Sequence, residues 1–291
     1  MGSGKVIKQL TIIGVGLIGG SLARALKRAG AVDEVVGAGR DAQHLQQALT
    51  LGVVDRTETD LAMAVQGADI VVVATPVGAT EAVFRSIAPG LSADTILTDV
   101  GSTKASVVAA AQAAFGRLPE NFVPAHPIAG TEKNGVEASF AELFEGRRII
   151  LTPTENSALQ ATARVRAMWE QTGAEVVETD VEHHDDVLAA TSHLPHLLAF
   201  SLVDTLAKLD AKQEVFEYAA GGFRDFTRIA SSDPEVWHDI CLHNSPALLK
   251  MLERFEVDLD RLRQAIADND SDYLLQVFRR AKAARDQFCE G

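Results

Sequence analysis

The order of apolar and polar positions divides the chain into two parts. From residue 6 to residue 178, short apolar runs alternate with amphipathic helical patterns. Strands are expected at residues 6–13, 34–38, 70–75, 95–100, 148–152 and 174–178. Helices are expected between them, at residues 21–29, 42–51, 61–65, 79–87, 104–114 and 158–171. This alternation predicts an α/β fold in which a doubly wound parallel sheet carries helices on both faces.

Beyond residue 178 the strand patterns stop. One long helix is expected over residues 181–209, bent at Pro195 because an interior proline removes a helix hydrogen bond. Further helices are expected at residues 213–219, 235–243, 247–267 and 272–288. Apolar side chains from Leu194 to Leu206 cover nearly the whole circumference of the first helix, which is typical of a helix buried on all sides. We therefore expect an α/β domain over residues 1–178, and an all-helical domain over residues 179–291 through which the chain forms a homodimer.

The first expected strand runs into a glycine-rich turn. The turn fits the G-x-G-x-x-G pattern between a strand and a helix, with the residues Gly14, Val15, Gly16, Leu17, Ile18 and Gly19. In this pattern the first glycine permits a tight turn, the second lets a pyrophosphate approach the main chain, and the third lets helix and strand pack closely. Free N–H groups and the helix dipole then hold the phosphates. The pattern predicts a Rossmann-type dinucleotide-binding domain, and a glycine-rich turn without a ligand is the alternative.

The end of the second expected strand bears on the choice of nicotinamide cofactor. An acidic residue at this place normally binds the ribose hydroxyls of the adenosine half. In this chain Gly39 stands there and Arg40 follows it, and a guanidinium pairs well with a ribose 2′-phosphate. Asp41 comes next, and a shift of one position in the turn would make it the ribose ligand. The pattern favours NADP over NAD, and a solvated turn residue is a third interpretation of Arg40.

Composition and charge narrow the function classes. The chain has 291 residues, of which 47% are hydrophobic and 23% are charged, as in an ordinary protein with a large core. A net charge of −13 argues against nucleic acid or an anionic membrane as the main partner, so an anionic small molecule would need local positive groups. No run of about 18 apolar residues is present. The two cysteines, Cys241 and Cys289, lack C-x-x-C spacing, and a cytoplasmic location is expected.

Candidate chemistry lies at two further strand ends and in one loop. Thr75 and Pro76 follow the third apolar run and Ser102 follows the fourth, so both segments are expected beside the nicotinamide. His126 lies between two prolines, which hold it on a stiff, extended backbone. Hydride transfer from an alcohol carbon needs a group that takes the hydroxyl proton, and neutral imidazole does this near neutral pH. His126 is therefore a candidate base, with a solvated loop histidine as the alternative.

Five short motifs follow one another along nearly the whole chain. They are GVGLIGGS at residues 14–21, DVGSTK at 99–104, HPIAG at 126–130, SHLPH at 192–196 and GGFRDFTRIA at 221–230, the last followed by Asp233, Pro234 and Trp237. Together they resemble the prephenate/arogenate dehydrogenase family of tyrosine biosynthesis. The resemblance implies oxidative decarboxylation of prephenate or arogenate to 4-hydroxyphenylpyruvate or tyrosine, with hydride transfer to NAD(P).

The resemblance also implies roles for individual residues. His126 matches the family's catalytic histidine, which accepts a hydrogen bond from the ring hydroxyl of the substrate. Ser102 matches a serine that orients this histidine and the nicotinamide, and Arg228 matches the arginine that binds a substrate carboxylate. Further positions that match the substrate pocket or its mouth are His196, Gly221, Trp237 and Glu132.

Other interpretations remain beside this one. The His-His-Asp-Asp run at residues 183–186 is similar to a metal-binding cluster, but a polar helix start explains it, and no metal site is expected. His193 is interpreted as a packing or hydrogen-bonding residue. The rival activities are another two-domain dehydrogenase of the 3-hydroxyacid type and a dinucleotide-sensing protein without turnover. The first needs a catalytic lysine in a helical context that this chain lacks, and the second leaves Ser102, His126 and Arg228 unexplained.

Overall fold

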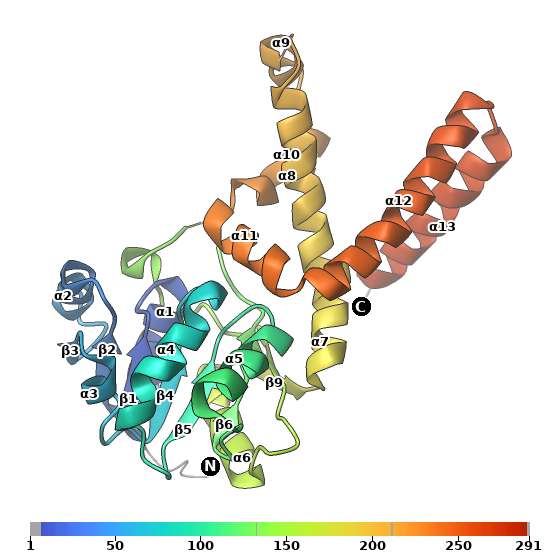
Figure 1. Ribbon diagram of the computed structural model, residues 1–291. Helices are drawn as coiled ribbons and strands as arrows, with labels where there is room; N and C mark the ends of the chain where they lie inside the picture. The colour runs from blue at the N-terminus through green and yellow to red at the C-terminus, as the bar shows by residue number, and fades with distance from the viewer. Residues whose placement is uncertain (1–6, 132, 211, 290–291) are drawn as a thin grey trace. The chain divides into compact units, whose positions relative to one another are not determined.

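A computed structural model describes residues 7–131, 133–210 and 212–289 (Figure 1). Contacts divide the chain into two compact units, Met1–Ser245 and Pro246–Gly291. The domain boundary expected after residue 178 falls inside the first unit, and it stays a prediction.

A parallel sheet forms the centre of the first unit. Within the described residues its six strands are β1 (Ile7–Ile13), β2 (Val32–Ala38), β3 (Arg56–Glu58), β4 (Ile70–Val73), β5 (Ile96–Asp99) and β6 (Phe122–Val123). Their order across the sheet is β3-β2-β1-β4-β5-β6, and every neighbouring pair is parallel. The chain changes direction across the sheet between β1 and β4, so their carboxyl ends are the point where such folds bind ligands. The short strands β3 and β6 carry no apolar run, which explains why the sequence pattern missed them.

Helices cover both faces of this sheet. Leu10, Ile12 and Val72 belong to one apolar core, whereas Ile13 and Val71 belong to another, because successive side chains of a strand point to opposite faces. The first core is covered by α1 (Leu17–Arg28), α2 (Ala42–Thr50) and α6 (Leu159–Glu170). The second is covered by α3 (Leu61–Ala64), α4 (Thr80–Ile87) and α5 (Ala105–Phe115). The expected doubly wound α/β fold is confirmed (Figure 1).

A second, smaller sheet holds His126. It consists of β7 (Ala125–Pro127), β8 (Arg148–Leu151) and β9 (Glu175–Glu178), with β7 antiparallel and β9 parallel to β8. The pattern predicted β8 and β9 but placed His126 in a loop. In the structure His126 pairs with Ile150 across the sheet, so its backbone is held by strand pairing as well as by the neighbouring prolines.

The long helix expected over residues 181–209 is interrupted. It consists of α7 (Val181–Leu188), a π-helical turn (η4, Ala189–His193) and α8 (Leu194–Ala207). Pro195 is the second residue of α8 and follows the π turn almost directly, so the irregularity lies in the turn before the proline. The path continues through α9 (Lys212–Glu217), α10 (Gly221–Thr227), η5 (Arg228–Ser231) and α11 (Pro234–His243).

The segment Val181–Ala207 is long and apolar enough to cross a membrane by length and composition alone, although the sequence pattern predicted no such segment. The difference arises because a few polar residues within the segment interrupt its apolar run without lowering its mean hydropathy far. One such helix is weak evidence for a membrane, because the core helix of a soluble protein passes the same test. His184 and Asp185 of this segment are buried, and they form hydrogen bonds with other parts of the protein.

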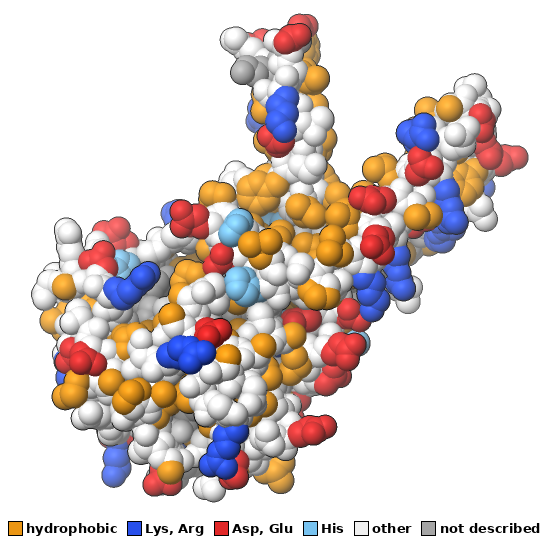
Figure 2. Space-filling view, in the orientation of Figure 1, with side chains coloured by type: hydrophobic (Ala, Val, Ile, Leu, Met, Phe, Trp, Pro, Cys, Tyr) orange, Lys and Arg blue, Asp and Glu red, His pale blue; other side chains and the backbone are white. Residues whose placement is uncertain are grey.

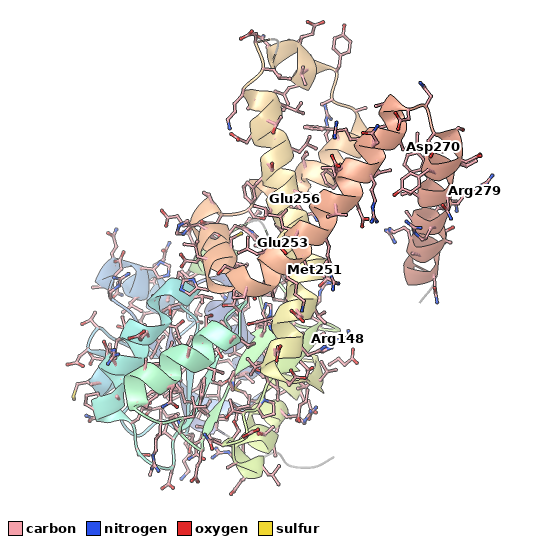
Figure 3. All side chains as sticks on the ribbon, turned by 45° about the vertical axis from the view of Figure 1, so that its right-hand side comes forward. Arg148, Met251, Glu253, Glu256, Asp270 and Arg279 are labelled. Atoms are coloured by element: carbon pink, nitrogen blue, oxygen red, sulfur yellow. The ribbon has the colours of Figure 1, made fainter. Side chains whose placement is uncertain are left out.

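The second unit is a pair of helices, α12 (Ser245–Ala267) and α13 (Ser271–Cys289), which lie side by side (Figure 1). Figure 3 labels Glu253 and Glu256 on α12 and Arg279 on α13, and charged side chains of this kind alternate with apolar ones along both helices. Large apolar side chains that stay exposed here are Leu249, Val257, Leu259, Ile266, Leu275 and Phe278. Apolar side chains at the surface of the C-terminal helices are also visible in Figure 2.

Candidate active site

An open cleft of about 1350 Å³ lies at the carboxyl ends of β1, β2 and β4. This is the place that the strand order predicts for a ligand. Among the residues proposed for the cofactor, those that line the cleft are Gly14, Val15, Gly16, Gly39, Arg40, Asp41, Thr75 and Pro76. Leu17, Ile18 and Gly19 form the first turn of α1, which begins directly after Gly16 and four residues earlier than expected.

The glycines of the turn have three different environments. Gly14 has a φ of +94°, and a Cβ there would come within 2.6 Å of the carbonyl oxygen of Ala74. A Cβ on Gly19 would come within 2.4 Å of the Gly14 carbonyl oxygen. A Cβ on Gly16 would meet no atom within 4 Å, because it would project into open space. Gly14 and Gly19 are therefore needed for the fold of the turn, whereas Gly16 keeps a space clear beside the backbone.

The residues of the cleft fit a dinucleotide. Gly16 is the N-cap of α1 and provides no side-chain hydrogen bond to the N–H groups of the first turn, so these groups can bind phosphate oxygens. In the described part of the chain, Thr75 Oγ1 is buried without a hydrogen-bond partner, and Thr75 lines the same cleft. An unsatisfied buried hydroxyl at this edge suits a ligand with polar groups.

The turn after β2 uses Asp41 for its own stability. The carboxylate of Asp41 accepts hydrogen bonds from the backbone N–H groups of Gln43 and His44 and so caps α2. These bonds lower the pKa of Asp41. Arg40 is exposed at the cleft, and His44 Nε2 lies 3.0 Å from the Val15 carbonyl oxygen. This contact joins α2 to the glycine turn across the cleft. The sequence pattern did not indicate a role for His44.

A chain of buried side chains begins at His126. His126 is only 8% exposed, and its Nδ1 lies 2.9 Å from His184 Nε2 on α7. The other nitrogen of that second ring, His184 Nδ1, lies 2.8 Å from Asp185 Oδ1. The two rings meet edge to face, with centroids 5.1 Å apart. A strand and a helix that are distant in the sequence are thus joined by a His-His-Asp series.

The end of this series is anchored at the start of α5. Asp185 accepts hydrogen bonds from the backbone N–H groups of Lys104 (2.8 Å) and Ala105 (2.9 Å). The Lys104 ammonium is completely buried and donates to Asp99 Oδ2 at 2.5 Å and to the Ala125 carbonyl at 2.7 Å. This ion pair holds β7 beside β5, and so sets the position of His126.

A second group of rings lies close to the first. His196 stacks on Trp237 with ring centroids 3.5 Å apart and an angle of 15°, and His193 meets the same indole edge to face at 6.2 Å. Asn244 donates to His193 Nδ1. The charge of Arg228 is near enough to lower the pKa of His196. The structure therefore brings together three of the residues proposed for the substrate, namely Arg228, His196 and Trp237.

Burial lowers the pKa values of the histidines of the site and so favours their neutral forms. Burial, followed by the nearby His184, Lys104 and His193, lowers the pKa of His126 well below its usual value. Burial also lowers the pKa of His193 to about 4 and, together with Arg228, lowers the pKa of His196. A neutral buried imidazole holds a lone pair that can accept a proton from a substrate.

The other residues proposed for the site are Ser102, Gly221 and Glu132. Ser102 is half-buried in the loop after β5. Gly221 is exposed at the start of α10. Glu132 lies outside the described residues. The roles proposed for these three residues remain predictions.

Sequence reasoning missed the second half of the His-His-Asp series. The polar run at residues 183–186 is the start of α7, as expected, but His184 and Asp185 are buried rather than solvated. One feature of the sequence could have indicated that His184 is buried. It stands four residues before the buried Leu188, on the apolar side of the helix. In the described part of the chain no group of His, Cys, Asp and Glu is arranged to hold a metal ion.

Comparison with known proteins agrees with this geometry. Residues 22–178 match the family model described as "Prephenate dehydrogenase, nucleotide-binding domain", and residues 180–280 match "Prephenate dehydrogenase, dimerization domain". A cyclohexadienyl dehydrogenase of Zymomonas mobilis is 44% identical over 286 residues, which are 96% of each chain. A prephenate dehydrogenase of Bacillus subtilis is 38% identical over 95% of this chain and 75% of its own length.

Solved structures give the same result. The prephenate dehydrogenase of A. aeolicus, solved in complex with hydroxyphenyl propionate and NAD+, superposes with a TM-score of 0.91 and 36% identity over 98% of this chain and 100% of its own. Synechocystis arogenate dehydrogenase has a TM-score of 0.81 and 29% identity over 96% of this chain and 99% of its own.

The cleft at the carboxyl ends of the parallel strands and the buried histidine of the second sheet fit a dehydrogenase with a Rossmann-type domain. The chain belongs to the prephenate dehydrogenase family, with that family's nucleotide-binding and dimerization domains. The resemblance drawn from the motifs is confirmed, and the rival 3-hydroxyacid dehydrogenase and sensor interpretations are not favoured.

Proposed function

We propose that this chain catalyses the NAD(P)-dependent oxidative decarboxylation of prephenate, arogenate or both, giving 4-hydroxyphenylpyruvate or tyrosine. The observation that carries the proposal is the neutral, buried ring of His126 on a rigid strand, in a chain whose cleft suits a dinucleotide. The names of its relatives support the substrate class, since they include cyclohexadienyl, prephenate and arogenate dehydrogenases.

His126 takes the proton of the ring hydroxyl in this proposal. When bound, the nicotinamide ring supplies the acceptor for the hydride that leaves ring C4. Loss of the proton and the hydride leaves an electron-poor ring opposite the ring carboxylate. The bond to that carboxylate then breaks, CO₂ leaves, and its electron pair completes the aromatic ring. The protein has to position the ring and bind the carboxylates, and it needs no separate catalyst for the loss of CO₂.

The group around Trp237 is proposed as the substrate pocket. Arg228 supplies a local positive charge in an acidic chain and binds a carboxylate, with His196, Trp237, Gly221 and Glu132 as the other proposed pocket residues and Ser102 beside the nicotinamide. The ring of His196 donates its Nδ1–H to the Ser192 carbonyl, so the neutral ring offers Nε2 as an acceptor. An amino group on the substrate suits this atom better than a keto oxygen.

NADP is the cofactor that we favour, and NAD is the alternative. Asp41 is engaged as the cap of α2, and the place of the usual ribose carboxylate is held by Gly39. Arg40 at the cleft is then available for a 2′-phosphate. In Arg40→Ala, KM for NADP should rise about tenfold or more, and KM for NAD should change little. Equal effects on both cofactors would remove Arg40 from this role.

We also propose a homodimer formed through the helical domain, in the cytoplasm, without nucleic acid or membrane partners. Exposed apolar side chains on the C-terminal helices support the dimer, because a soluble monomer rarely leaves so many uncovered. The net charge of −13 supports the exclusion of nucleic acid. Sedimentation at micromolar concentration tests the dimer, and a monomer would overturn it.

The activity is tested with four assays that combine prephenate or arogenate with NAD or NADP, following reduced cofactor by absorbance. Turnover with either substrate, together with release of CO₂, supports the proposal. The four rates rank the substrates and cofactors at the same time. If no combination gives turnover while calorimetry shows that NAD(P) binds, the proposed reaction is wrong.

A further inference from the structure

We propose that His184 and Asp185 are positioning residues that hold the ring of His126 in the one neutral tautomer able to accept a substrate proton. The inference rests on the proposed function of His126 as the base. It deepens that function by assigning a task to two residues that sequence analysis interpreted as a polar helix start. Neither residue needs to touch the substrate, because each acts through the next ring.

The direction of every hydrogen bond follows from Asp185. An ionised carboxylate only accepts, so His184 Nδ1 must carry a proton and donate it to Asp185 Oδ1. A neutral His184 then has a bare Nε2, which accepts. The partner of that atom, His126 Nδ1, is therefore the protonated nitrogen of its ring. The other nitrogen, His126 Nε2, is left with its lone pair.

Asp185 stays ionised for a structural reason. Its two oxygens accept the backbone N–H groups of Lys104 and Ala105, which begin the 11-residue helix α5, where the helix dipole favours a negative charge. The hydrogen bond from His184 adds to these, and together they lower the pKa of Asp185 despite its burial. The series thus starts from a carboxylate that remains charged near neutral pH.

The groups around His184 and His126 favour this direction of the hydrogen bonds and this orientation of the rings. His184 is about 1% exposed, and its pKa is lowered mainly by burial and by Lys104, while Asp185 and Asp99 act in the opposite direction. The Lys104 ammonium also binds the Ala125 carbonyl, next to His126 in the chain. On the other side, Asn244 donates to the Asp185 carbonyl and to His193, the remaining titratable ring near His126.

The arrangement has two chemical consequences. In the resting enzyme His126 Nε2 is ready to accept, whereas the opposite tautomer would place an N–H against the substrate hydroxyl and block proton transfer. Once His126 has taken the proton, its Nδ1–H donates to His184, and the carboxylate of Asp185 stabilises the positive charge through the second ring. Both effects act on turnover more than on substrate binding.

The first test compares three variants. In His184→Leu the His126 Nδ1–H loses its acceptor, and kcat should fall about 100-fold while KM changes by less than about threefold. In His184→Gln the amide oxygen can occupy the place of the ring Nε2, and most of kcat should return. His183→Leu removes the neighbouring exposed histidine and should keep kcat, which controls for the helix itself. Unchanged kcat in a folded His184→Leu would overturn the inference.

The second test needs no variant of the series. In protein labelled with ¹⁵N-histidine, the signals of His126, assigned by their loss in His126→Asn, should show a protonated Nδ1 and a bare Nε2 near neutral pH. A protonated Nε2 would overturn the inference even if His184→Leu fails to fold. The proposed function and the positioning role fail in different ways. Full activity in His126→Asn would contradict the role of His126 as the base. Loss of activity in His126→Asn together with full activity in His184→Leu would contradict only the positioning role of His184 and Asp185.

Discussion

The cofactor cleft and the histidine cluster are built in opposite ways. The cleft is made mainly of backbone from short contiguous turns, and its shape depends on where glycine replaces a side chain. The cluster is made of side chains from a short strand, a helix with a π turn, a buried loop and a later helix. Local sequence can specify the first kind of site, whereas the second kind exists only after the chain has folded.

The difference predicts which changes separate function from stability. A substitution that fills the cleft should weaken nucleotide binding and leave the fold intact. A substitution in the cluster should lower turnover if it changes His126 or a hydrogen-bond partner of His126. It should lower stability if it breaks the buried ion pair between Lys104 and Asp99. The following variants test this separation.

His126→Asn has the largest expected effect on activity. Loss of a general base lowers kcat by roughly 10²–10⁴-fold, and the cleft should still bind NAD(P) with unchanged affinity. Steady-state kinetics and calorimetric titration of the cofactor measure the two quantities, and His183→Asn serves as the exposed control. Normal turnover in His126→Asn would remove this residue from the mechanism.

Lys104→Met should have the largest effect on stability. The ammonium is completely buried against Asp99, and removal of one partner leaves an uncompensated buried charge that costs about 3–5 kcal/mol of unfolding free energy. Lys27→Met removes a partly exposed ion pair with Asp55 and should cost less than about 1 kcal/mol. Denaturant unfolding of both variants provides the comparison, and equal losses would contradict it.

Gly16→Ala should separate binding from folding. The added Cβ meets no protein atom, so the unfolding free energy should change little, while the affinity for NAD(P) falls about tenfold or more because the methyl occupies the pyrophosphate's place. Gly14→Ala should lower stability as well, since the new Cβ meets the Ala74 carbonyl at a φ of +94°. Thermal unfolding with and without cofactor measures both effects. A cofactor affinity unaffected by Gly16→Ala would show that the open space is not the binding site.

The pH dependence of stability gives the smallest effect. His193 has a pKa of about 4 in the folded protein against 6.5 in a free chain, so the unfolded state binds more protons between these values. The folded state is therefore destabilised as pH falls through this window, by on the order of 1 kcal/mol from His193 alone. His193→Gln should lose less stability than the parent protein between about pH 7 and about pH 5. Identical pH profiles would mean that the pKa of His193 is the same in the folded and unfolded states, which would contradict this prediction.

Most of the regular structure followed from the sequence pattern. Apolar runs predicted β1, β2, β4, β5, β8 and β9, and the spacing of apolar residues predicted the main helices. The pattern missed β3, β6, β7 and α10, because these elements span only two to seven residues. The three strands are held by pairing with distant partners. The π turn before Pro195 was also missed, because the apolar pattern predicted one continuous helix over residues 181–209.

The candidate site was found only in part. The glycine turn, Arg40 and His126 were proposed from patterns that local sequence can carry, and their roles stay predictions. His44, His184 and the buried Lys104 were not, because a polar residue at a helix start looks alike in sequence whether it faces solvent or the core. The position of Asp41 as a helix cap likewise became clear only from its hydrogen bonds.

The sequence by itself determined the class of fold, the nucleotide-binding turn and the family, because periodicity and contiguous motifs are local properties of the chain. The tertiary structure decided which polar side chains became partners. His126 and His184 are 58 residues apart, and Asp185 is 81 residues from Lys104. Hydrogen bonds and burial depend on distance in space, and no local pattern records the distance between a strand and a helix so far along the chain.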